Sequence, residues 1–158
     1  MNRNWKIFLD ERFVSKDIMD KRLENSIKYT FDLIKKDFPL LTVFAYDFWN
    51  EVFQVDDGGL RTAEEFKWMQ NYGDDTYIVN DFTYERKYAP SGCKLYINDF
   101  NEYMDKKTQK LKEKGVIDRI GIQSHLGITF PSDESCIPTL EKFCATGLEV
   151  QITAQLKN

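Results

Sequence analysis

The sequence is poor in the residues that build metal and disulfide sites. Its 158 residues include one histidine, His125, and three cysteines, at positions 93, 136 and 144. A single histidine cannot form a His-based metal site, and three widely spaced thiols match neither a zinc spacing nor a disulfide framework. We therefore expect free thiols and no metal site.

Long apolar runs are also missing. No segment approaches the roughly 20 apolar residues that span a bilayer, and the first five residues lack the apolar core of a signal peptide. We expect no membrane association and no export of the chain as written. Its 26 acidic and 22 basic residues are interleaved, with a net charge of −4, so we expect no surface that attracts nucleic acid.

Aromatic side chains, in contrast, are abundant. They make up 15% of a chain whose length suits one soluble domain. Aromatic rings either fill a core or stack on the apolar faces of pyranose sugars in a cleft. Composition alone favours the core. Trp5, Trp49 and Trp68 fit either interpretation.

Helical and strand patterns alternate along the chain. Apolar residues at three- or four-residue spacing predict a helix over 15–36, with Ser15 as its cap. Asp75 is a candidate cap for a helix to about Tyr88, and Thr62 with Glu65 forms a capping-box pattern. Further helices are expected over 102–114 and 138–144, and strands over 41–47, 94–97, 117–122 and 148–153. Four strand–helix repeats predict an α/β fold with a parallel sheet.

Polar residues follow the predicted strands, where parallel α/β folds place their functional groups. Asn50–Glu51, Asn98 and His125 occupy these positions. A glutamate there could protonate the leaving oxygen in glycoside hydrolysis, with the asparagine bonding a sugar hydroxyl. Each has a plainer interpretation in isolation: a solvent-facing glutamate, a turn pair in Asn98–Asp99, and a buried, satisfied histidine.

Taken together, four segments resemble glycoside hydrolase family 10. The family's Trp-Asp-Val-Val-Asn-Glu is similar to residues 46–51, its Tyr-Asn-Asp-Tyr-Asn to residues 97–101, and its Asp-Gly-Ile-Gly-Met-Gln-Ser-His-Leu to residues 118–126. Residues 148–153 resemble the stretch before the family's nucleophile. The motifs occur in the family's order over nearly the whole chain.

The resemblance implies a fold and a set of roles. The fold would be one partial (β/α)₈ domain over residues 1–158, of about four βα units that correspond to strands 4 to 7 of the family barrel. Glu51 would be the acid/base of an endo-1,4-β-xylanase that retains configuration, and Asn50, Asn98 and Gln123 would contact xylan. His125 would orient the nucleophile. No cofactor would be needed, and family members are typically secreted.

The sequence also departs from the family. Ala154 stands where the nucleophilic glutamate is expected, and a methyl group cannot form a glycosyl-enzyme. A complete barrel takes about 250 residues, so the early and last family segments are absent. The predicted helix over 102–114 is short and rich in lysine.

Three outcomes stay open on these grounds: an impaired xylanase, a non-catalytic xylan-binding remnant, or a truncated gene product without activity. An open four-stranded parallel sheet leaves edges and a face uncovered. We therefore expect marginal stability or self-association through these edges.

Overall fold

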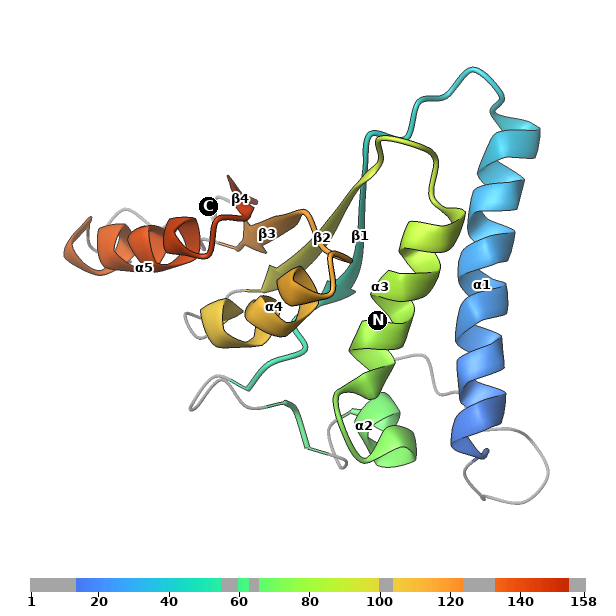
Figure 1. Cartoon of the computed structure of the whole chain (residues 1–158), viewed down its shortest axis with the longest axis horizontal. Helices are drawn as coiled ribbons and strands as arrows, with labels where there is room; N and C mark the ends of the chain where they lie inside the picture. The colour runs from blue at the N-terminus through green and yellow to red at the C-terminus, as the bar shows by residue number, and fades with distance from the viewer. Residues whose placement is uncertain (1–13, 55–59, 63–65, 100–103, 124–132, 154–158) are drawn as a thin grey trace, which may run out of the picture.

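The computed structural model describes residues 14–54, 60–62, 66–99, 104–123 and 133–153, and within these it leaves the side chains of 104–107 and 133–136 undescribed (Figure 1). Its centre is a sheet of four parallel strands in the order β1-β2-β3-β4. They are β1 (Ala45–Asn50), β2 (Lys94–Asp99), β3 (Arg119–Ile122) and β4 (Glu149–Ile152). The predicted α/β class and parallel sheet are therefore confirmed.

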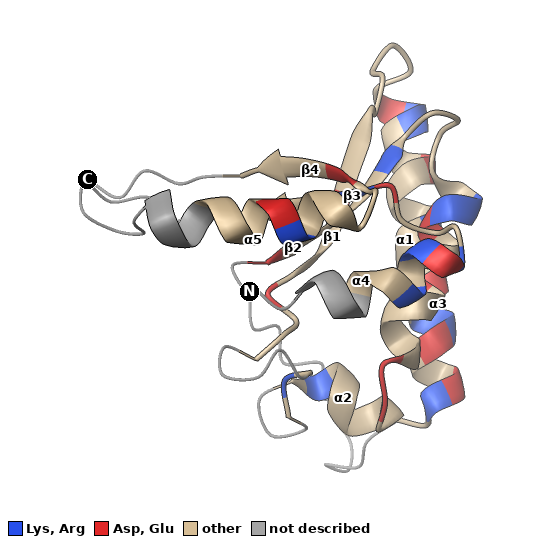
Figure 2. Ribbon diagram, turned by 60° about the vertical axis from the view of Figure 1, so that its left-hand side comes forward, with Lys and Arg blue, Asp and Glu red and all other residues tan. Residues whose placement is uncertain are grey.

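Helices precede, connect and flank these strands. They are α1 (Lys16–Asp37), α2 (Lys67–Tyr72), α3 (Thr76–Tyr88), α4 (Met104–Glu113) and α5 (Asp133–Ala145). Helices α1 and α3 lie side by side, and α5 contacts β4 (Figure 1). Figure 2 shows acidic and basic residues interleaved along α1 and α3. Among the described helices, none is long and apolar enough to cross a membrane.

The register of the parallel strands separates an apolar face from a polar one. Trp49 pairs with Ile97, and Ile97 with Ile120, and all three are buried in the main core. The neighbouring row pairs Asn50 with Asn98, and continues across Gly121 to Gln151. Because side chains alternate between the faces of a strand, the apolar row is buried in the core and the polar row lies on the opposite face.

Several predicted boundaries and caps were wrong. Strand β1 begins at Ala45 and not at residue 41, because its ladder with β2 starts at the pair Ala45–Lys94. Ser15 and Asp75 occupy the N-cap positions of α1 and α3 but make no side-chain cap hydrogen bond. Helix α5 begins before Pro138, which lies inside it. The predicted start of a helix near Thr62 cannot be followed, since residues 63–65 lie outside the described ranges.

Helix α1 packs through the apolar stripe that its sequence predicts. Met19, Leu23, Ile27 and Phe31 are all buried. Polar side chains join α1 to the neighbouring helices: the Asp20 carboxylate accepts hydrogen bonds from Tyr72 (3.0 Å), from Asn80 (2.7 Å) and from Tyr84. These bonds fix the position of α1 beside α2 and α3.

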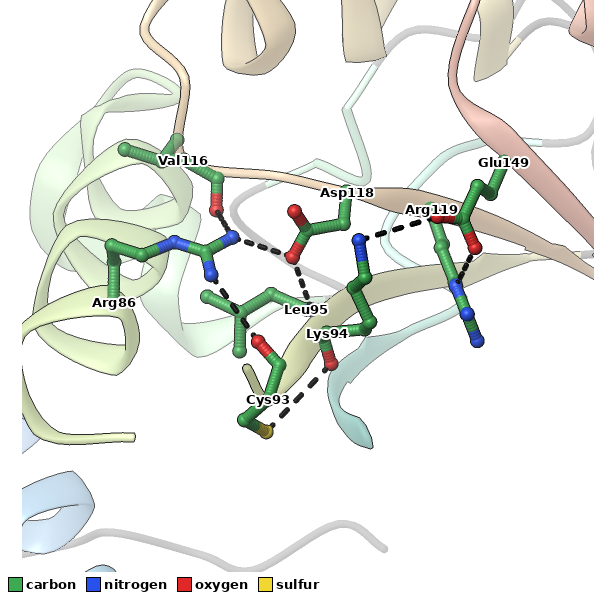
Figure 3. Close-up of polar contacts among 8 residues, drawn as sticks. All are labelled: Arg86, Cys93, Lys94, Leu95, Val116, Asp118, Arg119 and Glu149. Atoms are coloured by element: carbon green, nitrogen blue, oxygen red, sulfur yellow. Dashed lines mark hydrogen bonds and ion pairs between the residues drawn. The ribbon is translucent and has the colours of Figure 1, made fainter. Parts of the chain in front are cut away.

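A second polar cluster ties α3 to the sheet (Figure 3). The Arg86 guanidinium donates to the Asp118 carboxylate (2.6 Å) and to the carbonyl oxygens of Cys93 (3.2 Å) and Val116 (3.3 Å). The Leu95 N–H donates to the same Asp118 oxygen at 2.9 Å. Partial burial raises the pKa of Asp118, but these two donors outweigh it and place the pKa below its ordinary value.

We predict that Asp118→Asn lowers the free energy of unfolding at pH 7 by about 1–2 kcal/mol. This is the contribution of a charge-assisted hydrogen bond to Arg86, reduced because both side chains are partly exposed. A carboxyl with a lowered folded pKa stabilises the protein above its unfolded pKa of about 3.9, and this stability is lost as the pH falls. Urea unfolding between pH 7 and pH 3 should therefore show the two proteins converging in acid. A constant difference at all pH values would contradict this account. Asp32→Asn, in the exposed pair with Lys28 (2.7 Å), is the control and should change little.

Candidate active site

Glu51 directly follows β1, at the carboxyl end of the sheet. Its backbone is left-handed, with φ of 56°, and within the described ranges it is the one non-glycine residue with a positive φ. This conformation costs of the order of 1–3 kcal/mol and persists only where surrounding contacts fix it. One such contact is the hydrogen bond from the Glu51 N–H to the Asn98 carbonyl oxygen, at 3.0 Å.

Arg61 provides a second contact to Glu51. Its Nε donates to the Glu51 carbonyl oxygen at 2.7 Å, and its Nη2 lies 3.8 Å from the carboxylate Oε2. The Glu51 side chain is 38% exposed. The backbone of Glu51 is thus fixed from both sides, while its carboxyl group faces solvent next to a cation.

Amide side chains at the ends of β1, β2 and β3 and a threonine hydroxyl at the end of β4 form one hydrogen-bonded chain. The Asn50 Oδ1 accepts hydrogen bonds from Asn98 Nδ2 (2.9 Å) and from Gln123 Nε2. On the other side, Thr153 Oγ1 donates to Asn98 Oδ1 at 2.7 Å. Residues that follow or end β1, β2, β3 and β4 are therefore linked beside Glu51.

This chain leaves polar groups available for a ligand. In the part of the protein that the structure describes, the Asn50 NH₂ and the Gln123 carbonyl oxygen have no hydrogen-bond partner, although the opposite end of each amide is engaged. A donor and an acceptor at fixed positions suit hydroxyl groups, which both accept and donate. Together with the Glu51 carboxyl, they could bind and protonate a polyhydroxylated ligand.

The pair Asn98–Asp99 ends β2 and does not form a turn, so the plainer interpretation of this pair was wrong. Asp99 is fully buried, and its carboxylate accepts a hydrogen bond from the Phe53 N–H at 3.2 Å. Its carbonyl oxygen accepts from the Gln123 N–H at 2.9 Å. Asp99 thus joins the segment after Glu51 to the end of β2.

The histidine, the alanine and the tryptophans singled out in the sequence do not join this hydrogen-bonded chain in the described structure. His125 and Ala154 lie outside the described residues, as does Trp5. Trp49 is a core residue, with 4% of its surface exposed. Trp68 packs against the core and lines a cavity of about 680 Å³ with residues of α1 and with Phe48, and neither Asn50, Asn98 nor Gln123 belongs to its lining.

Sequence reasoning missed two contributors to this site. Thr153 ends a predicted strand, but nothing in its local pattern indicates a bond to Asn98. Arg61 follows the Gly58–Gly59 loop, ten residues from Glu51. A bridge between Phe53 and Leu60 closes that loop and brings Arg61 to the site, and no spacing rule predicts such a closure.

A parallel α/β sheet with a glutamate and amides at its carboxyl end is the arrangement of barrel-type glycosidases. The family model for glycosyl hydrolase family 10 matches residues 4–155. The chain is 50% identical over 148 residues to the bifunctional endo-1,4-beta-xylanase XylA of Ruminococcus flavefaciens, which covers 89% of the chain. It is 40% identical to endo-1,4-beta-xylanase A of Halalkalibacterium halodurans, over 91% of the chain. The chain belongs to glycosyl hydrolase family 10.

Solved structures show the same fold. The structure of the CBM22-1–GH10 modules of the Clostridium thermocellum xylanase 10B, solved with xylohexaose, superposes with a TM-score of 0.82 at 37% identity and covers 90% of the chain. A GH10 structure from Paenibacillus barcinonensis superposes with a TM-score of 0.78 at 27% identity and covers 94%. The sheet and its helices are part of a (β/α)₈ barrel, as the sequence predicted.

The chain spans only part of these proteins. It covers 16% and 36% of the two xylanases named above, and 32% and 46% of the two solved chains. The prediction that the chain matches part of the family domain is therefore confirmed. The activity of the longer relatives is a proposal for this chain.

We predict that Gly121→Ala disrupts the amide chain. A Cβ at this position would lie 2.7 Å from Asn98 Oδ1, closer than atoms pack, and such overpacking costs typically 1–3 kcal/mol. Urea unfolding should show this loss, and the side-chain amide resonance of Asn98 should shift. Gly115→Ala is the control: it has a left-handed φ of 67° with nothing within 4 Å, so it should lower stability through the backbone alone. An unmoved Asn98 resonance in Gly121→Ala would argue against the linked site.

Proposed function

We propose that the carboxyl end of this sheet is the acid/base half of a xylan-hydrolysing site. Glu51 serves as the general acid/base, Asn50 and Gln123 bind sugar hydroxyls with Asn98 in the cleft as support for Asn50, and His125 stands at the position that orients the nucleophile in the family. The substrate class is β-1,4-xylan, cleaved internally with retention, and neither a metal nor a cofactor takes part. The observation that carries the proposal is the hydrogen-bonded chain linking Asn50, Asn98 and Gln123 beside Glu51.

The amide chain supports substrate binding because it fixes each amide in one orientation. Asn98 is 8% exposed and bonded at both ends of its amide, so it acts as a support for Asn50 more than as a direct ligand. Asn50 and Gln123 then present one donor and one acceptor toward solvent. Polar groups fixed by a supporting layer lose little freedom when a ligand binds.

Hydrolysis with retention requires a second carboxylate about 5–5.5 Å from the acid/base, on the other side of the anomeric carbon. Asp99, the carboxylate that ends β2, is buried and bonded to the Phe53 N–H. Because it cannot reach a sugar held at the strand ends, it does not serve as the nucleophile. With Ala154 at the expected position, we propose that the chain binds xylan and is impaired in its cleavage.

A xylan-binding remnant without catalysis is the second candidate. The alanine at position 154 favours it, since a methyl group forms no glycosyl-enzyme. General acid catalysis alone contributes typically 10²–10⁴-fold, far below the acceleration that glycosidases need. An impaired xylanase and a non-catalytic remnant both bind xylan. They differ in whether Glu51 changes the rate of xylan hydrolysis.

We predict that calorimetry with xylohexaose detects binding, and that Asn50→Ala and Gln123→Ala each weaken it by roughly tenfold through the loss of about one hydrogen bond, near 1.4 kcal/mol. Glu141→Gln, an exposed residue of α5, is the control and should bind like the parent chain. Absence of binding by the folded parent chain would refute the proposed site.

Reducing-sugar release from xylan tests the catalytic half of the proposal. We expect only trace release from the parent chain, because Ala154 stands at the position of the second carboxylate, and less from Glu51→Gln, because the remaining general acid still contributes to the rate. Release from the parent chain at the rate of a complete xylanase would overturn the proposed impairment, and equal trace release from both proteins would favour the remnant without catalysis.

A further inference from the structure

Two carboxyl groups are buried beneath the strand that carries Glu51. Asp81 and Glu85 are one turn apart on α3, so their side chains share a face of the helix. Both have no exposed surface, and no oxygen of either carboxyl has a hydrogen-bond partner in the part of the chain that the structure describes. An isolated buried carboxylate costs many kcal/mol, and such groups normally become protonated instead.

Strand β1 covers this pair. The Trp49 ring lies 5.2 Å from that of Tyr77, one turn before Asp81, and the Trp49 indole N–H lies close enough to lower the pKa of Asp81 without forming a hydrogen bond of normal geometry. Trp49 immediately precedes Asn50 and Glu51. The packing of Trp49 on α3 therefore fixes the strand end that carries the candidate acid/base.

Among the residues that the structure describes, no cation neutralises the pair. Arg86 follows Glu85 in sequence and slightly offsets the rise in its pKa, but its guanidinium is engaged by Asp118 and two carbonyl oxygens (Figure 3). The acidic residues that α1 turns toward α3 are engaged elsewhere, Asp20 with Tyr84 and Glu24 with Tyr88.

The other described titratable groups that act on the pair, or on which it acts, are acidic or uncharged. Burial, then the charge of Asp81 and that of Asp47 on β1, raise the pKa of Glu85. Burial alone raises that of Asp81. Secondary to burial, the pair in turn raises the pKa values of Tyr46 on β1 and, through Glu85, of Cys93 before β2. The pKa of Tyr72 on α2 is raised by burial, then by its hydrogen bond to Asp20, and least by Asp81.

We infer that Asp81 and Glu85 form a pH-sensitive latch beneath β1: uncharged, Asp81 packs beside Trp49 and Glu85 beside Tyr46 and Asp47, so that the pair holds the strand end next to Asn50 and Glu51, and its ionisation in alkaline solution releases that strand end. The carboxyl latch is inferred from the burial and packing of Asp81 and Glu85. It does not depend on the proposed function. Its consequence for the site is an upper pH limit on the ordered arrangement of the strand ends.

The direction of the pH effect follows from proton binding. In the unfolded chain both carboxyls ionise near pH 4, whereas in the folded protein they keep their protons to higher pH. The folded state therefore binds more protons above pH 4, and stability falls as the pH rises. The folding equilibrium constant drops by up to about tenfold per pH unit for each such carboxyl.

The test compares the parent chain with the double variant Asp81→Asn/Glu85→Gln by urea unfolding at pH 6 and pH 8. The parent chain's folding equilibrium constant should fall at least about tenfold, and that of the variant less than about threefold. The exposed pair Asp32→Asn/Glu141→Gln is the matched control and should behave like the parent. Equal pH dependence of parent and double variant would overturn the latch.

A second measurement keeps the test decisive if the double variant does not fold. Carbon-13 resonances of the Asp81 and Glu85 carboxyls, followed by NMR in the folded parent chain, should retain the protonated chemical shift at pH 7. The Trp49 indole resonance should change as these carboxyls titrate at higher pH. Carboxyl titration near pH 4 would overturn the inference regardless of how any variant behaves.

Discussion

The parallel register of the four strands is the constraint on which the rest of the structure depends. It places Trp49, Ile97 and Ile120 in one buried row and Asn50, Asn98 and Gly121 in the next. A shift of one residue in any strand would exchange the apolar and polar faces. The same ladder brings the ends of strands distant in sequence close enough for Thr153, Asn98, Asn50 and Gln123 to form one hydrogen-bonded chain.

Glycine at position 121 shows how closely the site depends on this register. The Asn98 side chain lies across the neighbouring strand at the place where a Cβ of residue 121 would stand. Asn98 can then bond both Asn50 and Thr153, while the strained backbone of Glu51 is fixed by the Asn98 carbonyl and by Arg61. Backbone pairing, side-chain amides and one loop arginine thus jointly fix the candidate acid/base.

The sequence was most informative where physical patterns are local. Helix α1 follows its apolar stripe, and Asn50, Glu51 and Asn98 do meet at one end of the sheet, while His125 lies outside the described residues. Motif order identified the family. Strand β1 was misplaced at its start because a strand exists only where a partner strand begins, here at Lys94. Proline at 138 was taken as a helix start, although α5 begins before it.

What could not be predicted comes from tertiary contacts. Arg61 reaches Glu51 only because a loop closes, and a bridge between Phe53 and Leu60 has no sequence signature. Asp81 and Glu85 lie on a predicted helix, where charged residues normally face solvent. Their burial depends on the tertiary packing of β1 against α3, and the nearest described cation, Arg86, is engaged by Asp118. The self-association expected from the open sheet edges stays a prediction.

The central claim is that the amide chain beside Glu51 is where a sugar binds. Its most direct test is an NMR titration of the isotopically labelled chain with xylohexaose, following side-chain resonances. The account predicts that the side-chain amides of Asn50 and Gln123 shift together, while the resonances of Met19, Phe48 and Trp68 around the cavity beside α1 stay unchanged. Shifts confined to the resonances around that cavity, with no shift of the Asn50 and Gln123 side-chain amides, would contradict this account.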